Sequence, residues 1–108
     1  MSVAARRACE DLDNRLYLSL ASVWEIQIKQ QLGKLQLNAS WREMIKTQQQ
    51  DNDLTLLPLE LLHIEALNHL PPVHKDPFDR MLIAQAIEES MTIITVDGYF
   101  ADYPVSII

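Results

Sequence analysis

The sequence predicts an α/β fold built on a short, mostly parallel sheet. Short apolar runs that suit strands alternate with longer segments whose apolar residues recur at helical spacing. The changes between the two patterns fall mostly at Gly, Pro, Ser or Asp, which favour the ends of helices. Because strands joined through helices usually pair in parallel, we expect helices to flank the sheet as a three-layer sandwich.

Five segments combine the apolar spacing of a helix with a residue that begins or ends one. Ser and Asp favour the N-cap, Pro suits the first helical position, and Gly often follows the last turn. The expected helices are residues 2–11 with Ser2 as the cap, residues 20–32 before Gly33, residues 41–49 after Ser40, residues 59–70 before Pro71 and Pro72, and a helix that begins at Pro77 after the cap Asp76.

Four short apolar runs predict strands: residues 16–18, 54–57, 92–96 and 105–108. We expect residues 16–18 to be buried. The β-branched run 92–96 indicates burial on both faces of its sheet. Residues 98–103 are expected to form a turn or a short helix. Linkers and repeats are absent from the sequence, so we expect one domain over residues 1–108.

Composition narrows the class of protein. A chain of 108 residues with 48% hydrophobic and 22% charged residues is that of a folded single domain, not of a disordered segment. The net charge of −6 argues against a broad electrostatic surface for nucleic acid. It leaves room for a small acidic metal site that acts on phosphodiesters.

Compartment signals are few. The single cysteine, Cys9, excludes an internal disulfide and fits a reducing cytoplasm. The first twelve residues are charged and lack the apolar core of a signal peptide. No apolar run approaches the roughly 20 residues that span a bilayer. We therefore expect a soluble, cytoplasmic protein without a membrane partner.

Three acidic residues stand where ligands bind in parallel α/β sheets, beyond the carboxyl ends of strands. Asp97 ends the strand 92–96, and Glu25 lies about two turns beyond the strand 16–18. Asp79 lies in the first turn of its helix, and at about 100° per residue it falls on the apolar face. A carboxylate on that face is costly unless it is paired. The three acids are therefore expected to converge on one edge of the sheet, where they could hold Mg²⁺ or Mn²⁺.

Several of these residues also have simpler structural interpretations. Asp76 is a favoured N-cap, and Asp79 suits the positive end of the helix dipole. Ser22 and Glu25 have the spacing of a capping box. Asp97 and Gly98 could form a plain turn, and Arg80 could be solvated, balance charge or contact a substrate. The three histidines, His63, His69 and His74, show no metal-binding spacing and are expected at the surface or in loops.

The segments together resemble a PIN domain of the bacterial VapC-type toxin group, over nearly the whole chain and in family order. The strongest match is His74-Lys75-Asp76-Pro77-Phe78-Asp79-Arg80-Met81-Leu82-Ile83-Ala84-Gln85-Ala86. The others are Leu16-Tyr17-Leu18-Ser19 with Ser22-Val23-Trp24-Glu25-Ile26, Leu32-Gly33-Lys34-Leu35, Leu57-Pro58-Leu59, Thr95-Val96-Asp97 with Phe100, and Tyr103-Pro104-Val105.

The resemblance implies a Mg²⁺- or Mn²⁺-dependent ribonuclease that is paired with a small antitoxin protein and commonly dimerises. By that resemblance, Glu25, Asp79 and Asp97 correspond to the acidic metal-binding residues. Four neighbours are candidates for contact with substrate or for support of the acids, namely Ser22, Asp76, Arg80 and Thr95.

The sequence departs from the family pattern at its beginning. The resemblance implies that a PIN domain starts with a central strand that ends in an Asp, and we expect that strand and its acid to be missing before residues 2–11. We expect the strands 16–18 and 54–57 to be separated from the strands 92–96 and 105–108. The open inner edges could close on each other, take a strand from a second copy, or be filled by sequence upstream of Met1.

Two functions follow from this pattern. The first is a toxin-type endoribonuclease whose carboxylates hold a metal ion. The alternative is a catalytically impaired PIN remnant that serves protein interaction or oligomerisation. In a third, weaker interpretation, the chain is purely an interaction module and its acids serve only as helix caps.

Overall fold

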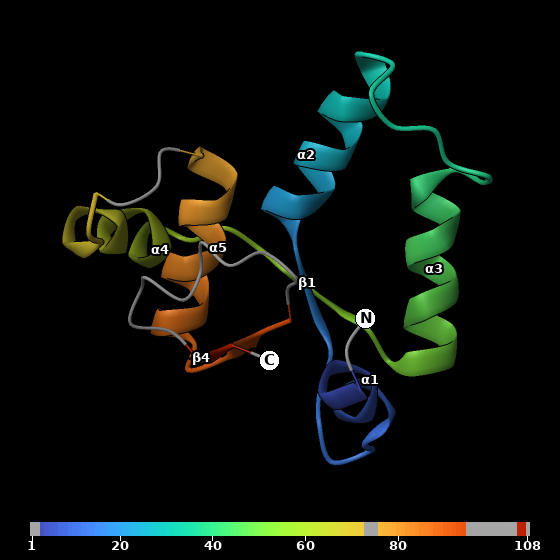
Figure 1. Cartoon of the computed structure of the whole chain (residues 1–108), viewed down its shortest axis with the longest axis horizontal. Helices are drawn as coiled ribbons and strands as arrows, with labels where there is room; N and C mark the ends of the chain where they lie inside the picture. The colour runs from blue at the N-terminus through green and yellow to red at the C-terminus, as the bar shows by residue number, and fades with distance from the viewer. Residues whose placement is uncertain (1–2, 73–75, 95–105, 108) are drawn as a thin grey trace. The chain divides into compact units, whose positions relative to one another are not determined.

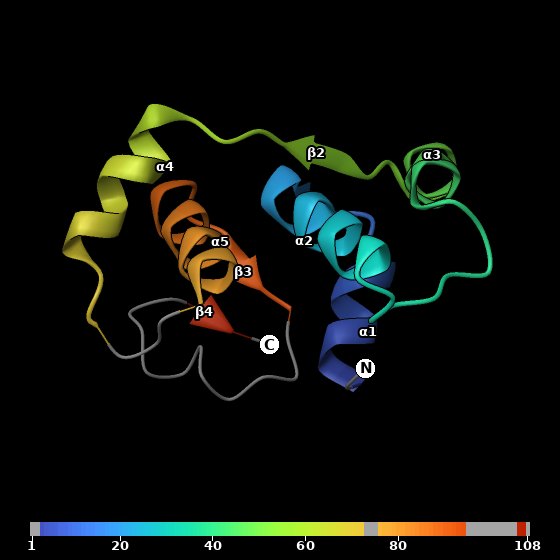
Figure 2. The same cartoon turned by 90° about the horizontal axis from the view of Figure 1, so that it is seen from above.

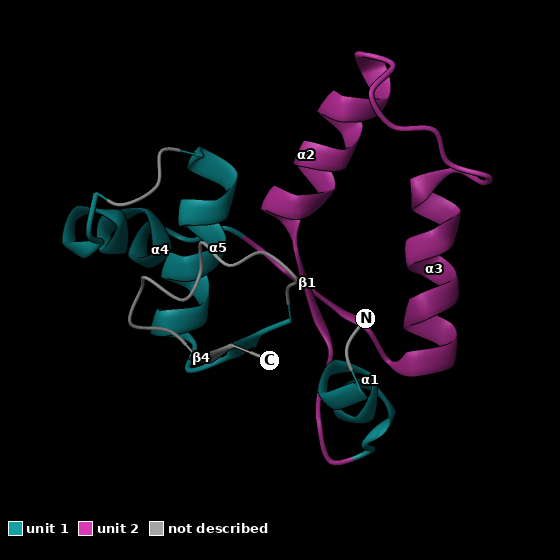
Figure 3. Ribbon diagram, in the orientation of Figure 1, with its two compact units in different colours: residues 1–12, 59–108 teal, residues 13–58 magenta. Residues whose placement is uncertain are grey.

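The computed structural model describes residues 3–72, 76–94 and 106–107 (Figure 1). Helices alternate with short strands, and the described strands pair only in parallel, which confirms the predicted α/β class. The chain divides into two compact units (Figure 3). Unit 1 comprises residues 1–12 and 59–108, and unit 2 comprises residues 13–58.

Unit 2 contains two strands and two helices in the order β1 (Tyr17–Ser19), α2 (Leu20–Gln31), α3 (Trp41–Asn52) and β2 (Thr55–Leu57). Strands β1 and β2 are parallel neighbours, and Leu18 is paired with Leu56 at the centre of the register. The pairing of β1 with β2 brings the beginning and the end of unit 2 together. Helices α2 and α3 form the crossover that connects the two strands along the chain.

Local sequence signals set the ends of these helices. Ser19 caps α2, because its hydroxyl oxygen accepts the Ala21 N–H at 3.1 Å. Gly33, just beyond α2, has a φ of +73°, which glycine adopts without steric cost. Ser40 caps α3, and its hydroxyl oxygen accepts the Glu43 N–H at 3.2 Å. The sequence predicted the stop at Gly33 and the cap Ser40 correctly.

Unit 2 buries little of its own apolar surface. Ser19 and Ala21 are its only buried residues. The strand predicted to be buried is half-buried at best, because Tyr17 is exposed. Trp24 is 60% exposed, and Trp41 is half-buried with its indole N–H donating to the side-chain oxygen of Gln27 at 2.7 Å. A segment of this length with so small a core has little hydrophobic stabilisation of its own.

Unit 1 contains the remaining elements. They are α1 (Val3–Glu10), α4 (Leu61–Ala66), the short 3₁₀ helix η1 (Leu67–His69), α5 (Pro77–Glu88), β3 (Thr92–Ile93) and β4 (Ser106–Ile107). Strands β3 and β4 are parallel neighbours. Helix α5 packs against both α4 and β3 (Figure 2). No helix in the described part of the chain is long and apolar enough to cross a membrane.

The single helix predicted over residues 59–70 is two shorter pieces. Glu60 has extended backbone angles and occupies the N-cap, so α4 starts only at Leu61. The last turn tightens into η1, whose C-cap Leu70 is extended. The extended conformation at Leu70 has a physical reason, because a residue before proline is pushed out of the helical region by the ring of Pro71.

The core of unit 1 forms around Ile83, which is fully buried in α5. Its half-buried apolar neighbours come from η1's cap, α5 itself and β3: Leu70, Leu82, Ile87 and Ile93. The prediction that residues 92–96 are buried on both faces is wrong where it can be followed, because Thr92 and Ile94 are exposed. Residues 95–96 and the turn expected at residues 98–103 lie outside the described residues.

The strand pairing agrees with the two separated pairs expected from the sequence. Within the described residues, β1–β2 and β3–β4 are two independent two-stranded sheets. Isolated pairs this short are marginal in water, so each depends on the helices packed against it.

Ser90, directly after the C-cap of α5, offers a test of backbone strain. Its φ is +54°, in the left-handed region that costs a non-glycine residue roughly 1 kcal/mol. We expect Ser90→Gly to raise the free energy of unfolding by about 1 kcal/mol, measured by urea denaturation. Ser22→Gly, inside α2, should instead lower it by roughly 0.5–1 kcal/mol. An unchanged or lowered stability of Ser90→Gly would contradict the assigned strain.

Candidate functional site

The first turn of α5 is organised by Asp76. One of its carboxylate oxygens, Oδ1, accepts the N–H of Phe78 at 2.9 Å and the N–H of Asp79 at 3.2 Å. Pro77 occupies the first helical position, where its missing N–H costs nothing. The predicted cap is confirmed, and the Asp-Pro pair therefore fixes where the helix that carries Asp79 begins.

Asp79 combines two features in one position. It is the third residue of α5, at the end where the helix dipole favours a negative charge. It is also half-buried, on the face that leads to the buried residues Ile83 and Ala86 one and two turns further on. The structure therefore agrees with the inward phase that the sequence predicted, while the dipole interpretation holds as well.

Glu25 lies in α2, in unit 2. Its side chain is 23% exposed, and its Oε2 lies 3.4 Å from Nζ of Lys29 one turn further on. Lys29 is 53% exposed, so this ion pair is weak and leaves the carboxylate available. Ser22 lies inside the helix and Ser19 is the cap, so the alternative interpretation of Ser22 and Glu25 as a capping box does not hold.

The predicted acidic set is only partly within the described residues. Glu25 belongs to unit 2 and Asp79 to unit 1. Asp97 and Thr95 lie outside the described residues, as does His74. The expected convergence of the three acids therefore stays a prediction.

Arg80 is neither a solvated charge nor turned away from the protein. Its guanidinium is part-buried, and it donates from Nη1 to the carbonyl oxygen of Pro71 at 3.0 Å and from Nη2 to that of Leu67 at 3.3 Å. Leu67 is the first residue of η1, and Pro71 lies two residues beyond its end. The side chain next to Asp79 thus links the start of α5 to the end of the preceding helix.

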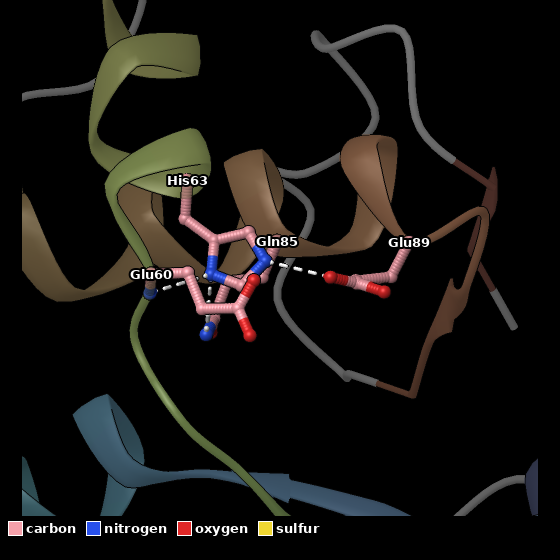
Figure 4. A network of polar contacts seen from close by, with 4 residues as sticks. All are labelled: Glu60, His63, Gln85 and Glu89. Carbon is pink, nitrogen blue, oxygen red and sulfur yellow. Dashed lines mark hydrogen bonds and ion pairs between the residues drawn. The ribbon is translucent and has the colours of Figure 1, made fainter.

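A second polar cluster lies between α4 and α5 and is drawn in Figure 4. We call its four residues, Glu60, His63, Gln85 and Glu89, the His63 network. His63 is fully buried and Gln85 is 1% exposed. The Glu60 backbone N–H donates to Nδ1 of His63 at 3.1 Å, and Nε2 of His63 lies 2.9 Å from Oε1 of Glu89. Nε2 of Gln85 lies 3.4 Å from the same Nδ1.

The distances alone would allow this network to hold a metal ion. Glu60, His63 and Glu89 each offer a ligand atom, and these atoms lie within 4.8 Å of one another. The hydrogen bonds argue otherwise. A backbone N–H can only donate, so Nδ1 must accept and the neutral ring carries its proton on Nε2. Nδ1 is thus occupied by the Glu60 N–H, and Nε2 carries its proton toward Glu89, so neither ring nitrogen has a free lone pair for an ion. The described arrangement is therefore a polar bridge between two helices.

Sequence reasoning missed this network. His63 was expected at the surface, and its complete burial shows that this prediction was wrong. The signal was present, because His63 has helical spacing with Ala66, Leu67 and Leu70, all of which are buried or half-buried. His69 is exposed, as predicted.

Comparison with known families assigns the chain. The PIN domain matches residues 2–105, so the chain belongs to the PIN domain family. PIN domains are generally nucleases, often dependent on a metal ion. No curated protein and no solved structure matches the chain significantly. The family match covers both units, including Glu25, Asp79 and Asp97.

The His63 network predicts a large stability effect. We expect His63→Ala to lower the free energy of unfolding by about 3 kcal/mol, because it leaves a cavity and buried polar groups without a partner. His63→Gln should lose less, since an amide keeps an acceptor and a donor. Urea denaturation measures both. The matched control is His69→Ala at an exposed position, expected within about 0.5 kcal/mol of wild type; equal losses at the two positions would refute the assigned role.

Proposed function

We propose that the chain is a metal-dependent endoribonuclease of the VapC toxin type. The observation that carries the proposal is the family match over residues 2–105, together with a half-buried Asp79 at the capped start of α5. Such a position gives a carboxylate both a fixed backbone and an environment in which a bound cation offsets the cost of its burial.

Glu25, Asp79 and Asp97 are the proposed metal ligands, with Mg²⁺ or Mn²⁺ as the ion. Carboxylate oxygens are the donors that these hard cations prefer, so the donor chemistry fits. When bound, the ion supplies polarisation of the phosphodiester and activation of a water for in-line attack. The protein's own part is to hold the carboxylates and to orient the RNA. Glu25 can serve this role because its pairing with Lys29 is weak.

For the toxin role we further propose a small antitoxin protein as a partner and a homodimer as the assembly, with strand exchange as one way to form it. Unit 2 supports an interaction surface, because it leaves several large apolar side chains exposed: Tyr17, Leu20, Trp24, Leu32 and Met44. The same observation favours the alternative function, an impaired PIN domain that acts only through protein contacts.

Cleavage assays distinguish the two functions. With Mn²⁺ and an RNA substrate, we expect Asp79→Asn and Glu25→Gln to lower kcat/KM at least about 10²-fold, since each removes a charge that holds the ion. Glu88→Gln provides the matched control, because it makes the same change of charge at an exposed position of α5. If wild type and Asp79→Asn are equally inert, the nuclease proposal fails and the interaction module remains.

Light scattering tests the proposed assembly. We expect a dimer mass at micromolar concentration, because both two-stranded sheets have edges open to pairing within the described residues. A monomer mass at high dilution together with a single cooperative unfolding transition would contradict the proposal.

A further inference from the structure

Arg80 makes two directional hydrogen bonds that the proposed function does not use. It follows Asp79 directly in α5, and its guanidinium donates from two different nitrogens to two carbonyl oxygens. We propose that Arg80 is a positioning residue for Asp79, whose side chain fixes the rotation of α5 at the site; the inference rests on the proposed function in so far as Asp79 holds the metal ion.

The acceptors explain why an arginine suits this position. The Leu67 carbonyl starts η1 and the Pro71 carbonyl follows its end, so both belong to one helix terminus. The Leu67 carbonyl also accepts the Leu70 N–H, at a long 3.4 Å, and carbonyls at a helix C-terminus carry partial negative charge that attracts a cation. A planar guanidinium offers several N–H groups in a rigid fork and bonds both oxygens at once.

Asp76 and Arg80 both hold the first turn of α5 in place. Asp76 holds the first turn through the Phe78 and Asp79 N–H groups. Arg80 holds the same turn to Leu67 and Pro71, which precede Arg80 by thirteen and nine positions. The cap sets where the helix starts, while the guanidinium sets which way the turn faces.

Small rotations at this turn have a large effect on a metal ligand. Asp79 is the neighbour of Arg80 in the same helical turn, about 100° around the helix axis. A rotation of this turn therefore moves both side chains. A side-chain carboxylate lies about 5 Å from a helix axis, so a rotation of about 10° displaces it by about 1 Å. Misplacement by 1 Å can reduce catalysis by about 10²-fold.

The positioning role makes a prediction that a charge role does not. Arg80→Lys keeps the positive charge but loses the planar pair of donors, whereas Arg80→Gln loses the charge as well. If Arg80 acts by positioning, both variants should weaken Mn²⁺ binding by roughly tenfold, the lower range for loss of a residue that orients a metal ligand. The kcat should fall in both variants while the KM for RNA stays unchanged. Arg7→Lys, at an exposed position of α1, is the matched control.

Three outcomes would overturn the inference. Wild-type Mn²⁺ affinity and kcat in Arg80→Lys, with a loss in Arg80→Gln, would show that the charge alone matters. A rise in the KM for RNA at constant kcat would show a substrate contact. Wild-type behaviour of both variants would show that the two hydrogen bonds are incidental.

One measurement is independent of the proposed function. Amide hydrogen exchange followed by NMR reports on the Phe78 and Asp79 N–H groups, whether or not the chain binds metal. We expect faster exchange at both amides in Arg80→Lys and no change in Arg7→Lys. Unchanged protection in Arg80→Lys overturns the inference. If wild type neither binds Mn²⁺ nor cleaves RNA, the proposed function fails, and this exchange result alone decides whether Arg80 positions the turn.

Discussion

His63 brings two ring nitrogens to a place that solvent does not reach, and each of them needs a partner there. The Glu60 N–H satisfies Nδ1, and the carboxylate of Glu89 receives the proton on Nε2. Because His63 belongs to α4 while Gln85 and Glu89 belong to α5 and its C-cap, the contacts of the ring bridge the two helices. The core around Ile83 forms between the elements that these contacts hold together. The same packing sets the position of α5, which carries Asp79.

The two ends of α5 are held by different chemistry. The His63 network bonds its C-terminal half through Gln85 and Glu89. Asp76 caps its N-terminal turn, and Arg80 bonds that turn to carbonyl oxygens of η1 and Pro71. A helix anchored by directional bonds at both ends is restrained in rotation as well as in position, which apolar packing alone achieves less well. That restraint matters most for Asp79, because a metal ligand tolerates little displacement.

Most of the local structure could be predicted from the sequence. Ser40, Gly33 and the Asp76-Pro77 pair act through bonds to residues within a few positions, so their roles follow from local chemistry. The two separate strand pairs were expected from the resemblance to the family, and the described strands agree with them. Apart from the single helix expected over residues 59–70, the predictions that failed concern burial, at residues 16–18, at residues 92–96 and at His63. Exposure depends on what packs against a segment from elsewhere in the chain.

The sequence by itself determined the α/β class and the helix caps Ser40 and Asp76. Only the tertiary structure decided the environment of His63 and the partners of Arg80. Both side chains bond to groups between 9 and 26 positions away in the chain, apart from the Glu60 N–H. No local spacing encodes such distances, because they arise when α4 and α5 pack. In the sequence, Arg80 therefore looked like a surface charge or a substrate contact. The fold makes Arg80 part of the support of Asp79.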